Sequence, residues 1–354
     1  MKRLGELVDL LNAQLIGDAN LQLDNAKTTL RATNTDITFV CSEKHLQQFL
    51  QSECLAAIIQ NSLETDLAAD QGKSFVIVQD PETAFKTIVE HFRPLPIRNR
   101  IGISDKAVVA ASAIVAEDVD IYPGVFIGEN VTIGCGAVIY PNVTILDGSK
   151  IGANTNLFPN VVVYENTIIG DRCLVHGGAV IGAYGFGYKS NERHVLSSQL
   201  GNVVIGNDVE IGSNTTIDRG TFDSTTIGDG SKLDDLVMIG HNCQIGKHNL
   251  FCSQVGIAGS TVTGDYVVMA GQVGIGDHLE IGDKVKIAAK SGVMHNLQQA
   301  QFYLGAPARP AREQMQIHAT VAKLPEMRKQ LKRLQRAVDQ LSSLSNDDVA
   351  NEAA

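Results

Sequence analysis

Aliphatic residues recur at every sixth position through most of the chain after residue 100. Counting by sixes from Ile103 to Ile181 meets only aliphatic side chains. The positions are Ile103, Val109, Val115, Ile121, Ile127, Ile133, Ile139, Ile145, Ile151, Leu157, Val163, Ile169, Val175 and Ile181. The count resumes at Ile205, and after a phase shift it runs from Ile227 to Val293 with Thr263 as its one polar member. A period of six fits neither the 3.6-residue turn of an α-helix nor the two-residue alternation of a strand.

This period predicts a β-helix made of hexapeptides, each contributing one short strand and one corner. Three hexapeptides form a triangular coil of 18 residues whose aliphatic side chains point inward. Stacked coils pair their backbones at a rise of about 4.8 Å per coil. Gly or Asn often follows the aliphatic residue, and both tolerate the positive φ that a tight corner needs. We therefore expect a mainly β protein with a parallel β-helix at residues 99–305.

Two segments interrupt the period. Between Ile181 and Ile205, counting by sixes meets Gly187, Arg193 and Gln199, which an apolar core does not accommodate. Residues 182–202 are therefore expected to form a loop that leaves the β-helix, and long loops of this kind are usually functional or disordered. The stretch "DRGTFDSTT" at 218–226 predicts a second, shorter excursion.

The segments on either side of the repeat have different residue patterns. Residues 1–98 alternate helical spacing ("LGELVDLLNAQL", "PETAFKTIVEHF") with strand-like runs ("ITFV", "LAAII", "SFVIV"), and they end in the proline-rich "RPLPIRNR". They predict a small α/β domain followed by a linker. Residues 306–345 predict a helical extension with apolar side chains three and four apart, which suits an oligomer seam. Residues 346–354 predict a disordered tail.

Composition limits the partners and the compartment. The formal net charge is −10, which argues against nucleic acid or an anionic membrane as the main partner. The six cysteines form no CxxC pair and no zinc-type spacing, so we expect reduced thiols and a cytoplasmic protein. No apolar run approaches the roughly 20 residues that a transmembrane helix needs.

Histidine is the remaining candidate for chemistry, since the chain has no GxSxG, no Walker A loop and no GxGxxG that opens a helix. His241 lies two residues after inward-facing Ile239, so its ring should project near a corner. His278 follows 37 residues later, which is two coils plus one residue, and should lie near the same edge about 10 Å along the axis. Flat outer faces favour a homotrimer whose clefts half-bury such a ring. Asp234 is either a corner residue or a carboxylate that fixes the imidazole tautomer.

The chain resembles the UDP-3-O-(3-hydroxyacyl)glucosamine N-acyltransferase family of lipid A biosynthesis. The resemblance covers nearly the whole chain. It is carried by "DITFVCSEKH", "VIGAYGFGY", "NVVIGNDVEIGSNTTIDRGTFDSTTIG", "LDDLVMIGHNCQIG" and "GQVGIGDHLEIGD". It implies a left-handed β-helix and transfer of a 3-hydroxyacyl group from acyl carrier protein to the 2-amino group of a UDP-sugar. No cofactor is implied, because the acyl group arrives on the phosphopantetheine of the carrier protein.

The resemblance also implies roles for particular residues. His241 corresponds to the general base, which suits an imidazole that titrates near neutral pH, and His278 corresponds to a supporting group. Phe39 would stack on the uracil, with His45 beside it. The remaining positions that it assigns to substrate binding are Asn242, Gly185, Phe186 and Gly187.

Some positions depart from the family pattern. The usual "N-x-K-Y" after the stacking Phe reads Ser42, Glu43, Lys44 and His45 here, so the contacts to uracil are altered. Tyr184 stands where Asp is common, and Asp235 stands where Asn is common. None of these changes affects His241.

Three alternatives compete with the acyltransferase interpretation. A zinc-dependent hexapeptide-fold carbonic anhydrase would use His241 and His278 with a third histidine, but Asp283 and Lys284 occupy the region expected for it. A coenzyme A-dependent sugar-nucleotide acetyltransferase and a non-catalytic scaffold would share the repeat. Through the family resemblance alone, the N-terminal domain and the "GFG" loop argue against both.

Two further features bear on the substrates. Residues 306–336 contain eight basic residues against Glu313 and Glu326, which predicts either a solvated helix face or a docking surface for acidic acyl carrier protein. Gly292 lies where a bulkier side chain would shorten a slot for the acyl chain. The sequence therefore permits long acyl chains.

Overall fold

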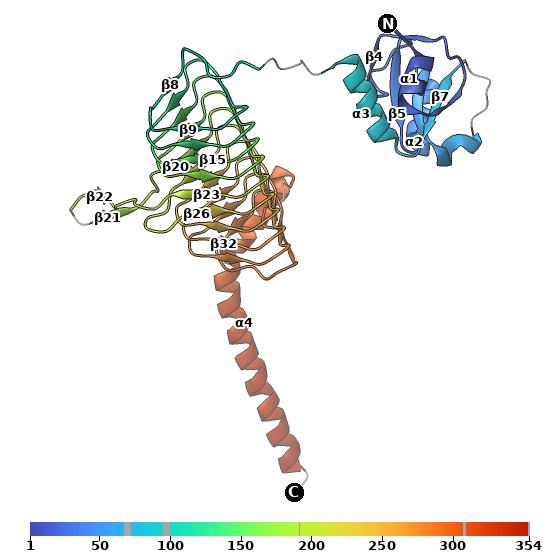
Figure 1. Cartoon of the computed structure of the whole chain (residues 1–354). Helices are drawn as coiled ribbons and strands as arrows, with labels where there is room; N and C mark the ends of the chain where they lie inside the picture. The colour runs from blue at the N-terminus through green and yellow to red at the C-terminus, as the bar shows by residue number, and fades with distance from the viewer. Residues whose placement is uncertain (67–71, 95–99, 191, 307–308, 353–354) are drawn as a thin grey trace. The chain divides into compact units, whose positions relative to one another are not determined.

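The structure, a computed structural model, describes residues 1–66, 72–94, 100–190, 192–306 and 309–352. It divides into two compact units, residues 1–99 and residues 100–354 (Figure 1). The predicted proline-rich linker and the predicted boundary at residue 98 fall largely on residues 95–99, which lie outside the described residues.

The N-terminal unit is an α/β domain with a five-stranded sheet in the order β2-β7-β6-β5-β4. Its strands are β1 (Lys2–Arg3), β2 (Gln14–Ile16), β3 (Gln22–Leu23), β4 (Asn25–Ala26), β5 (Asp36–Val40), β6 (Ala56–Gln60) and β7 (Ser74–Val78). Its helices are α1 (Leu4–Leu11), α2 (Glu43–Gln51), the short 3₁₀ helix η1 (Asn61–Asp66) and α3 (Pro81–Phe92). Strand β2 pairs antiparallel with β7, and the pairs among β7, β6, β5 and β4 are parallel.

Alternation along the central strands divides the interior of this unit into two cores. Ile58 of β6 packs in the core that contains residues of α1 and α3, whereas its neighbour Ile59 packs in the core that contains residues of α2. The predicted helices and strands are confirmed. Helix α2 was not predicted, because only Leu46 and Phe49 among its nine residues are buried.

The second unit contains a parallel β-helix, as predicted, whose walls are three sheets. Sheet 1 consists of β10 (Asp120–Ile121), β13 (Val138–Ile139), β16 (Asn156–Leu157), β19 (Leu174–Val175), β24 (Glu210–Ile211), β27 (Lys232–Leu233), β30 (Leu250–Phe251), β33 (Val268–Met269), β36 (Lys286–Ile287) and β38 (Phe302–Tyr303). Sheet 2 consists of β8 (Val108–Val109), β11 (Phe126–Ile127), β14 (Thr144–Ile145), β17 (Val162–Val163), β20 (Val180–Ala183), β25 (Thr216–Asp218), β28 (Met238–Ile239), β31 (Gly256–Ile257), β34 (Gly274–Ile275) and β37 (Gly292–Val293). Sheet 3 consists of β9 (Ile114–Val115), β12 (Thr132–Ile133), β15 (Lys150–Ile151), β18 (Ile168–Ile169), β23 (Val203–Ile205), β26 (Thr225–Ile227), β29 (Gln244–Ile245), β32 (Val262–Thr263) and β35 (Glu280–Ile281).

The register repeats every 18 residues, so equivalent side chains lie directly above one another. Ile121 pairs with Ile139, and Ile139 pairs with Leu157. At the two interruptions the same column continues over longer spacings, from Ile169 to Ile205 and then to Ile227. Both excursions are therefore inserted at a corner and leave the stack in register.

A second inward-facing column lies two residues before the aliphatic one, and the count by sixes did not detect it. Some of its members are aliphatic, as at Val125, but others are buried Ser or Thr. The Thr155 hydroxyl, for example, donates to the carbonyl of Gly170 at 2.7 Å. The same bond to a carbonyl in the next coil is made by Ser149, Thr215, Ser231 and Thr261. Thr263, the polar member of the aliphatic column, accepts a hydrogen bond from the Asn249 amide at 3.0 Å. These polar interior groups are therefore satisfied, whereas the buried Thr167 hydroxyl of the same column has no hydrogen-bond partner among the described residues.

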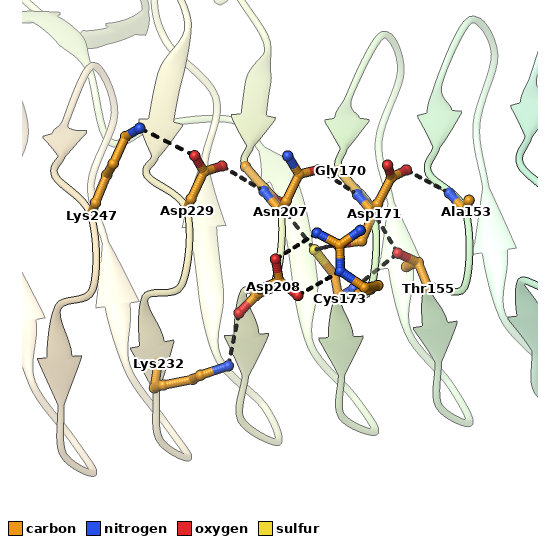
Figure 2. Close-up of polar contacts among 12 residues, drawn as sticks. Ala153, Thr155, Gly170, Asp171, Cys173, Asn207, Asp208, Asp229, Lys232 and Lys247 are labelled. Carbon is orange, nitrogen blue, oxygen red and sulfur yellow. Dashed lines mark hydrogen bonds and ion pairs between the residues drawn. The ribbon is translucent and has the colours of Figure 1, made fainter.

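Polar ladders also join the coils at their corners. Figure 2 shows one such ladder, in which the Ala153 N–H donates to Asp171, the Asp171 N–H to Asn207 and the Asn207 N–H to Asp229. The acceptor is the side chain in each case, and Lys247 pairs with the last carboxylate at 3.3 Å. Each ladder bond links a coil only to the next one.

The predicted loop at 182–202 is confirmed, and it contains an antiparallel hairpin of β21 (Tyr188–Ser190) and β22 (His194–Leu196) that projects from the stacked coils (Figure 1). The buried guanidinium of Arg219 holds the base of this loop. It donates to the carbonyls of Gly201 at 2.9 Å and Glu165 at 2.8 Å. The loop is thus anchored by a residue of the second, shorter excursion.

The chain continues into helix α4 (Ala311–Glu352). The helical extension predicted at 306–345 is present from residue 311, and the described helix continues through residues 346–352. The disordered tail stays a prediction. No Gly or Pro follows Pro325, so nothing in the sequence ends the helix at residue 345. Within the described residues, no helix has the length and apolar character needed to cross a membrane.

Candidate active site

A cavity of about 460 Å³ lies over the outward face of sheet 2 and the corner between sheets 2 and 3. Its lining residues are Phe186, Asp218, Met238, Gly240, His241, Gly256, Ile257, Ala258, Gly259, Ile275, Asp277 and His278. It therefore brings together both histidines selected from the sequence and one residue of the predicted loop. The lining is mostly apolar, with Asp218, Asp277 and the two histidines as its charged or ionisable groups.

His241 follows β28 and is held in one tautomer by Asn242. Its Nδ1 lies 3.0 Å from Oδ1 of Asn242, and the same oxygen accepts a hydrogen bond from the Thr221 N–H at 3.0 Å. Because a backbone N–H can only donate, the Asn242 atom between them is an acceptor, and Nδ1 must carry the hydrogen. Nε2 then holds a lone pair, and no described residue donates to it. Asn242 was predicted to bind substrate, whereas here its side chain orients the imidazole.

Two glycines allow close packing around the His241 ring. A Cβ on Gly185, in the loop of the preceding excursion, would lie 2.6 Å from the Cβ of His241. A Cβ on Gly259, in the next coil, would lie 2.8 Å from Nε2. Both distances are far inside van der Waals contact, so any larger residue would displace the ring. The ring is thereby confined between the loop and the next coil.

His278 lies on the predicted edge, in the column of Asn242. The corner residues Asn242, Ser260 and His278 all have positive φ and follow one another at 18-residue spacing. The backbone N–H of His278 donates to the carbonyl of Gly259 at 3.0 Å, and its exposed side chain lines the cavity. Within the described residues the Gly259 N–H donates to no group. It is therefore available to an oxyanion.

Asp218 is the acidic residue that the sequence analysis missed. It ends β25, which pairs with β28 in the next coil, and its side chain lines the cavity while only 5% of the residue is exposed. Burial raises the pKa of its carboxyl to about 6, and the nearby His241 opposes that rise. The sequence feature that could have identified Asp218 is an acidic residue directly after inward-facing Ile217, at the position that Gly240 occupies in the next coil. The longer coil at 218–226 concealed this correspondence.

Within one chain, the structure does not bring Asp234 to His241. Asp234 follows β27 of sheet 1, one corner away from His241, because seven residues of chain carry the backbone across a whole face of the triangle. Its carboxylate instead accepts the N–H groups of Asp235 at 2.8 Å and Ser253 at 2.9 Å. It is one of the residues that stabilise a corner.

The loop residues predicted to bind substrate divide into two groups. Gly185 contacts His241, and Phe186, 85% exposed, lines the cavity. Gly187 lies outside the cavity lining. Its N–H donates to the Gly185 carbonyl, and its own carbonyl accepts from the Ser197 N–H, both at 2.9 Å. Among the described residues, no three His, Cys, Asp or Glu side chains gather as a metal site would require.

Phe39 and His45 belong to the N-terminal unit. The Phe39 ring is half-buried against Phe85 of α3, with centroids 4.6 Å apart. His45 is exposed in the first turn of α2, and its N–H donates to the Ser42 hydroxyl at 3.3 Å. Ser42, which departs from the family pattern, is therefore the N-cap of α2. Uracil stacking by Phe39 stays a prediction.

Comparison with protein families identifies the class. The family model described as bacterial transferase hexapeptide (six repeats) matches residues 124–159, 148–183 and 224–259, all within the β-helix. A hexapeptide-repeat transferase is the class that this fold and this histidine-containing corner define.

Curated relatives identify the family within that class. The UDP-3-O-acylglucosamine N-acyltransferase of Rhodopirellula baltica is 48% identical over 316 residues, 89% of this chain and 81% of the relative. The enzyme of the same name from Syntrophotalea carbinolica is 42% identical over 97% of this chain and 99% of the relative. The chain therefore belongs to the UDP-3-O-acylglucosamine N-acyltransferase family, and it is an acyltransferase.

Solved structures of UDP-N-acetylglucosamine acyltransferases also match. The Francisella novicida enzyme is 26% identical, with a TM-score of 0.44, over 61% of this chain and 73% of that chain. The Arabidopsis enzyme is 25% identical, with a TM-score of 0.41, over 57% of this chain and 71% of that chain.

The packing of His241 leads to a first prediction. In Gly259→Ala, the new methyl group must push the ring aside, and a displacement of about 1 Å at a reacting group costs roughly 10²-fold in turnover. Gly271→Ala is the matched control, since its Cβ would meet its nearest atom, the Ser253 carbonyl oxygen, at an ordinary 3.5 Å. We expect Gly259→Ala to lose acyl transfer while its melting temperature stays near that of the control. Wild-type turnover in Gly259→Ala would contradict the assigned position of the ring.

Proposed function

We propose that this enzyme transfers a 3-hydroxyacyl group from acyl carrier protein to the 2-amino group of UDP-3-O-(3-hydroxyacyl)glucosamine in lipid A synthesis, with His241 as the general base. The observation that carries the proposal is the state of the imidazole. Asn242 holds the hydrogen on Nδ1, and the Nε2 lone pair has no donor among the described residues. A base of this kind is what an amine needs as it attacks a thioester.

The proposed reaction uses the cavity as follows. The sugar nitrogen attacks the thioester carbon, a C–N bond forms, and Nε2 of His241 takes a proton from the nitrogen. The Gly259 N–H stabilises the tetrahedral oxyanion. The C–S bond then breaks, the imidazolium returns the proton to the thiolate, and the products are the amide and the free phosphopantetheine thiol. His278 lines the same cavity and assists in binding the donor.

A path free of side chains supports an acyl substrate. On the outward face of sheet 2, Met238 pairs in register with Gly256, Gly256 with Gly274, and Gly274 with Gly292. A Cβ on any of the three glycines would meet no atom within 4 Å. The path begins at the His241 cavity and extends about 14 Å over three coil steps. A second cavity of about 210 Å³, lined in part by Gly292 and Met294, lies at its far end. We assign this path to the acyl chain.

The proposal assigns the remaining parts of the substrates to the flanking segments. The N-terminal unit binds the uracil through Phe39. Basic side chains of α4, which are exposed, form the docking surface for the carrier protein. The exposed apolar side chains of α4, among them Leu324, Leu331 and Leu334, contact the same helix of other copies in a homotrimer. The reaction takes place in the cytoplasm, in keeping with six cysteines that lack a disulfide pattern.

The central experiment replaces the proposed base. His241→Ala should keep the fold and lower turnover by roughly 10²–10⁴-fold, the usual scale for losing a general base. His278→Ala should lower turnover by a smaller factor. Both are measured with the UDP-sugar acceptor and with the acyl group on either acyl carrier protein or coenzyme A. Near-normal turnover of His241→Ala would refute the mechanism, and a preference for the coenzyme A donor would refute the assigned donor.

The glycine path predicts how chain length is selected. Gly292→Met places a side chain across the far end, so long 3-hydroxyacyl donors lose contacts that short donors never make. Losing two buried methylenes costs about 1.6 kcal/mol, so the preference for long over short donors should fall by at least about tenfold. Glu280→Met, on the exposed face of sheet 3, is the control. An unchanged length profile in Gly292→Met would show that the chain lies elsewhere.

The basic face of α4 predicts a salt-dependent donor interaction. Arg328, Lys332 and Arg336 are spaced four apart and share one helix face. Reversing all three to Glu should raise KM for acyl carrier protein at low salt, with a smaller difference at high salt because screening weakens steering. The oligomeric mass is checked in parallel. An unchanged KM in a variant of normal mass would show that these residues only solvate the helix.

A further inference from the structure

The His241 cavity contains a second polar group that no part of the fold satisfies. Asp218 is 95% buried and lines the cavity, yet its carboxylate accepts no hydrogen bond from the described residues. Burying a carboxylate without a donor destabilises a fold. A destabilising arrangement of this kind is retained where a functional site requires it. The carboxylate is therefore positioned for a ligand rather than for the protein.

Asp218 is not required to orient the imidazole. Nδ1 of His241 is already bonded to Asn242, so the usual place for an orienting carboxylate is taken. The cavity consequently presents two hydrogen-bond acceptors with no donor of their own, the Asp218 carboxylate and the Nε2 lone pair. A hydroxyl has one hydrogen and satisfies only one of them. A primary amine has two hydrogens and satisfies both.

We propose that Asp218 is a catalytic residue that binds the acceptor amine directly, accepting one N–H while Nε2 of His241 accepts the other. This inference rests on the proposed function. With both hydrogens held, the nitrogen lone pair is directed at the thioester carbon. As the C–N bond forms, the nitrogen becomes positively charged, and the ionised carboxylate stabilises that charge. His241 takes the proton, and Asp218 takes none.

The charge state of Asp218 suits this role at neutral pH. Its pKa, raised by burial to about 6, leaves the carboxyl mostly ionised at pH 7. The titratable groups that face it are His241 and Cys243, and burial raises the pKa of the Cys243 thiol to about 11, so that thiol is neutral. Asp277 and His278 line the same cavity.

Because the folded state raises this pKa, ionisation of Asp218 opposes folding as the pH rises. Asp218→Asn should therefore melt at the same temperature as the wild type or higher at pH 8. The difference should shrink as the pH falls through about 6 and vanish only below the unfolded-state pKa of 3.8, where the carboxyl is protonated in both states. A residue with a purely structural role would give the opposite sign. Asp171→Asn is the matched control, since Asn207 already performs the same corner function in the next coil.

The binding experiment uses no acyl donor. Wild type, Asp218→Asn and Asp171→Asn are titrated by calorimetry at pH 8 with UDP-glucosamine and with UDP-glucose, which has a hydroxyl in place of the amine. Wild type and Asp171→Asn should prefer the amine by at least about tenfold, and Asp218→Asn should lose that preference. Equal preference in all three proteins would overturn the assignment of Asp218.

The kinetic experiment separates this inference from the proposed function. With acyl carrier protein donor, Asp218→Asn should lower kcat by roughly 10²–10³-fold, the scale of losing one preorganised electrostatic contact, with KM for the donor unchanged. Wild-type kcat in Asp218→Asn would overturn the inference and leave the proposed function intact. If the wild-type enzyme fails to acylate the UDP-sugar amine, the proposed function fails, and the titration still decides whether Asp218 recognises an amine.

Discussion

The inward-facing aliphatic column is the constraint on which the rest of this enzyme depends. Because Ile217, Ile239 and Ile257 pair in strict register, residues that follow them at equal distances also lie one above another. The burial of these columns stabilises the coils, and it also determines which functional side chains meet. His241, Gly259 and Asp277 line one cavity because they share a column at 18-residue spacing. A slip of one residue would turn every column out of the core.

The candidate active site gathers around one corner, that between sheets 2 and 3, where two of its three coils are lengthened by an excursion. The 182–202 loop leaves this corner after β20, the shorter excursion leaves it after β25, and His241 occupies it after β28. Three successive coils therefore contribute the loop glycine, the buried acid and the histidine proposed as the base. The repeat supplies rigid positions, including that of His241, and the two lengthened corners add Gly185 and Asp218.

The sequence predicted those parts that follow from the period of six. The β-helix, both excursions and the place of His241 and His278 along one edge needed only the count and the coil rise. The polar inward column was not predicted from the sequence. A residue such as Thr155 or Ser231 resembles a surface residue until the carbonyl partner of its hydroxyl in the next coil is known. Such a partner lies 15 residues away and is visible only once the coils are stacked.

The sequence pointed to Asp234 rather than Asp218 for a related reason. Asp234 is close to His241 in sequence, but the chain crosses a whole face between them. Asp218 is 23 positions away from His241 in sequence, but it lies one coil away in space. Counting by 18 also missed it, because the excursion lengthens that coil by a few residues. In a solenoid, nearness in sequence is a poor guide to contact, and the coil length must be known locally.

The glycine path has a consequence for how its length can change. Anything lying along Gly256, Gly274 and Gly292 passes one side-chain position per coil, about 4.8 Å apart. Between those positions it meets only backbone, which mutation cannot enlarge. The usable length can therefore be altered only in discrete steps, one coil at a time. The spacing of the fold sets the unit in which selectivity can evolve.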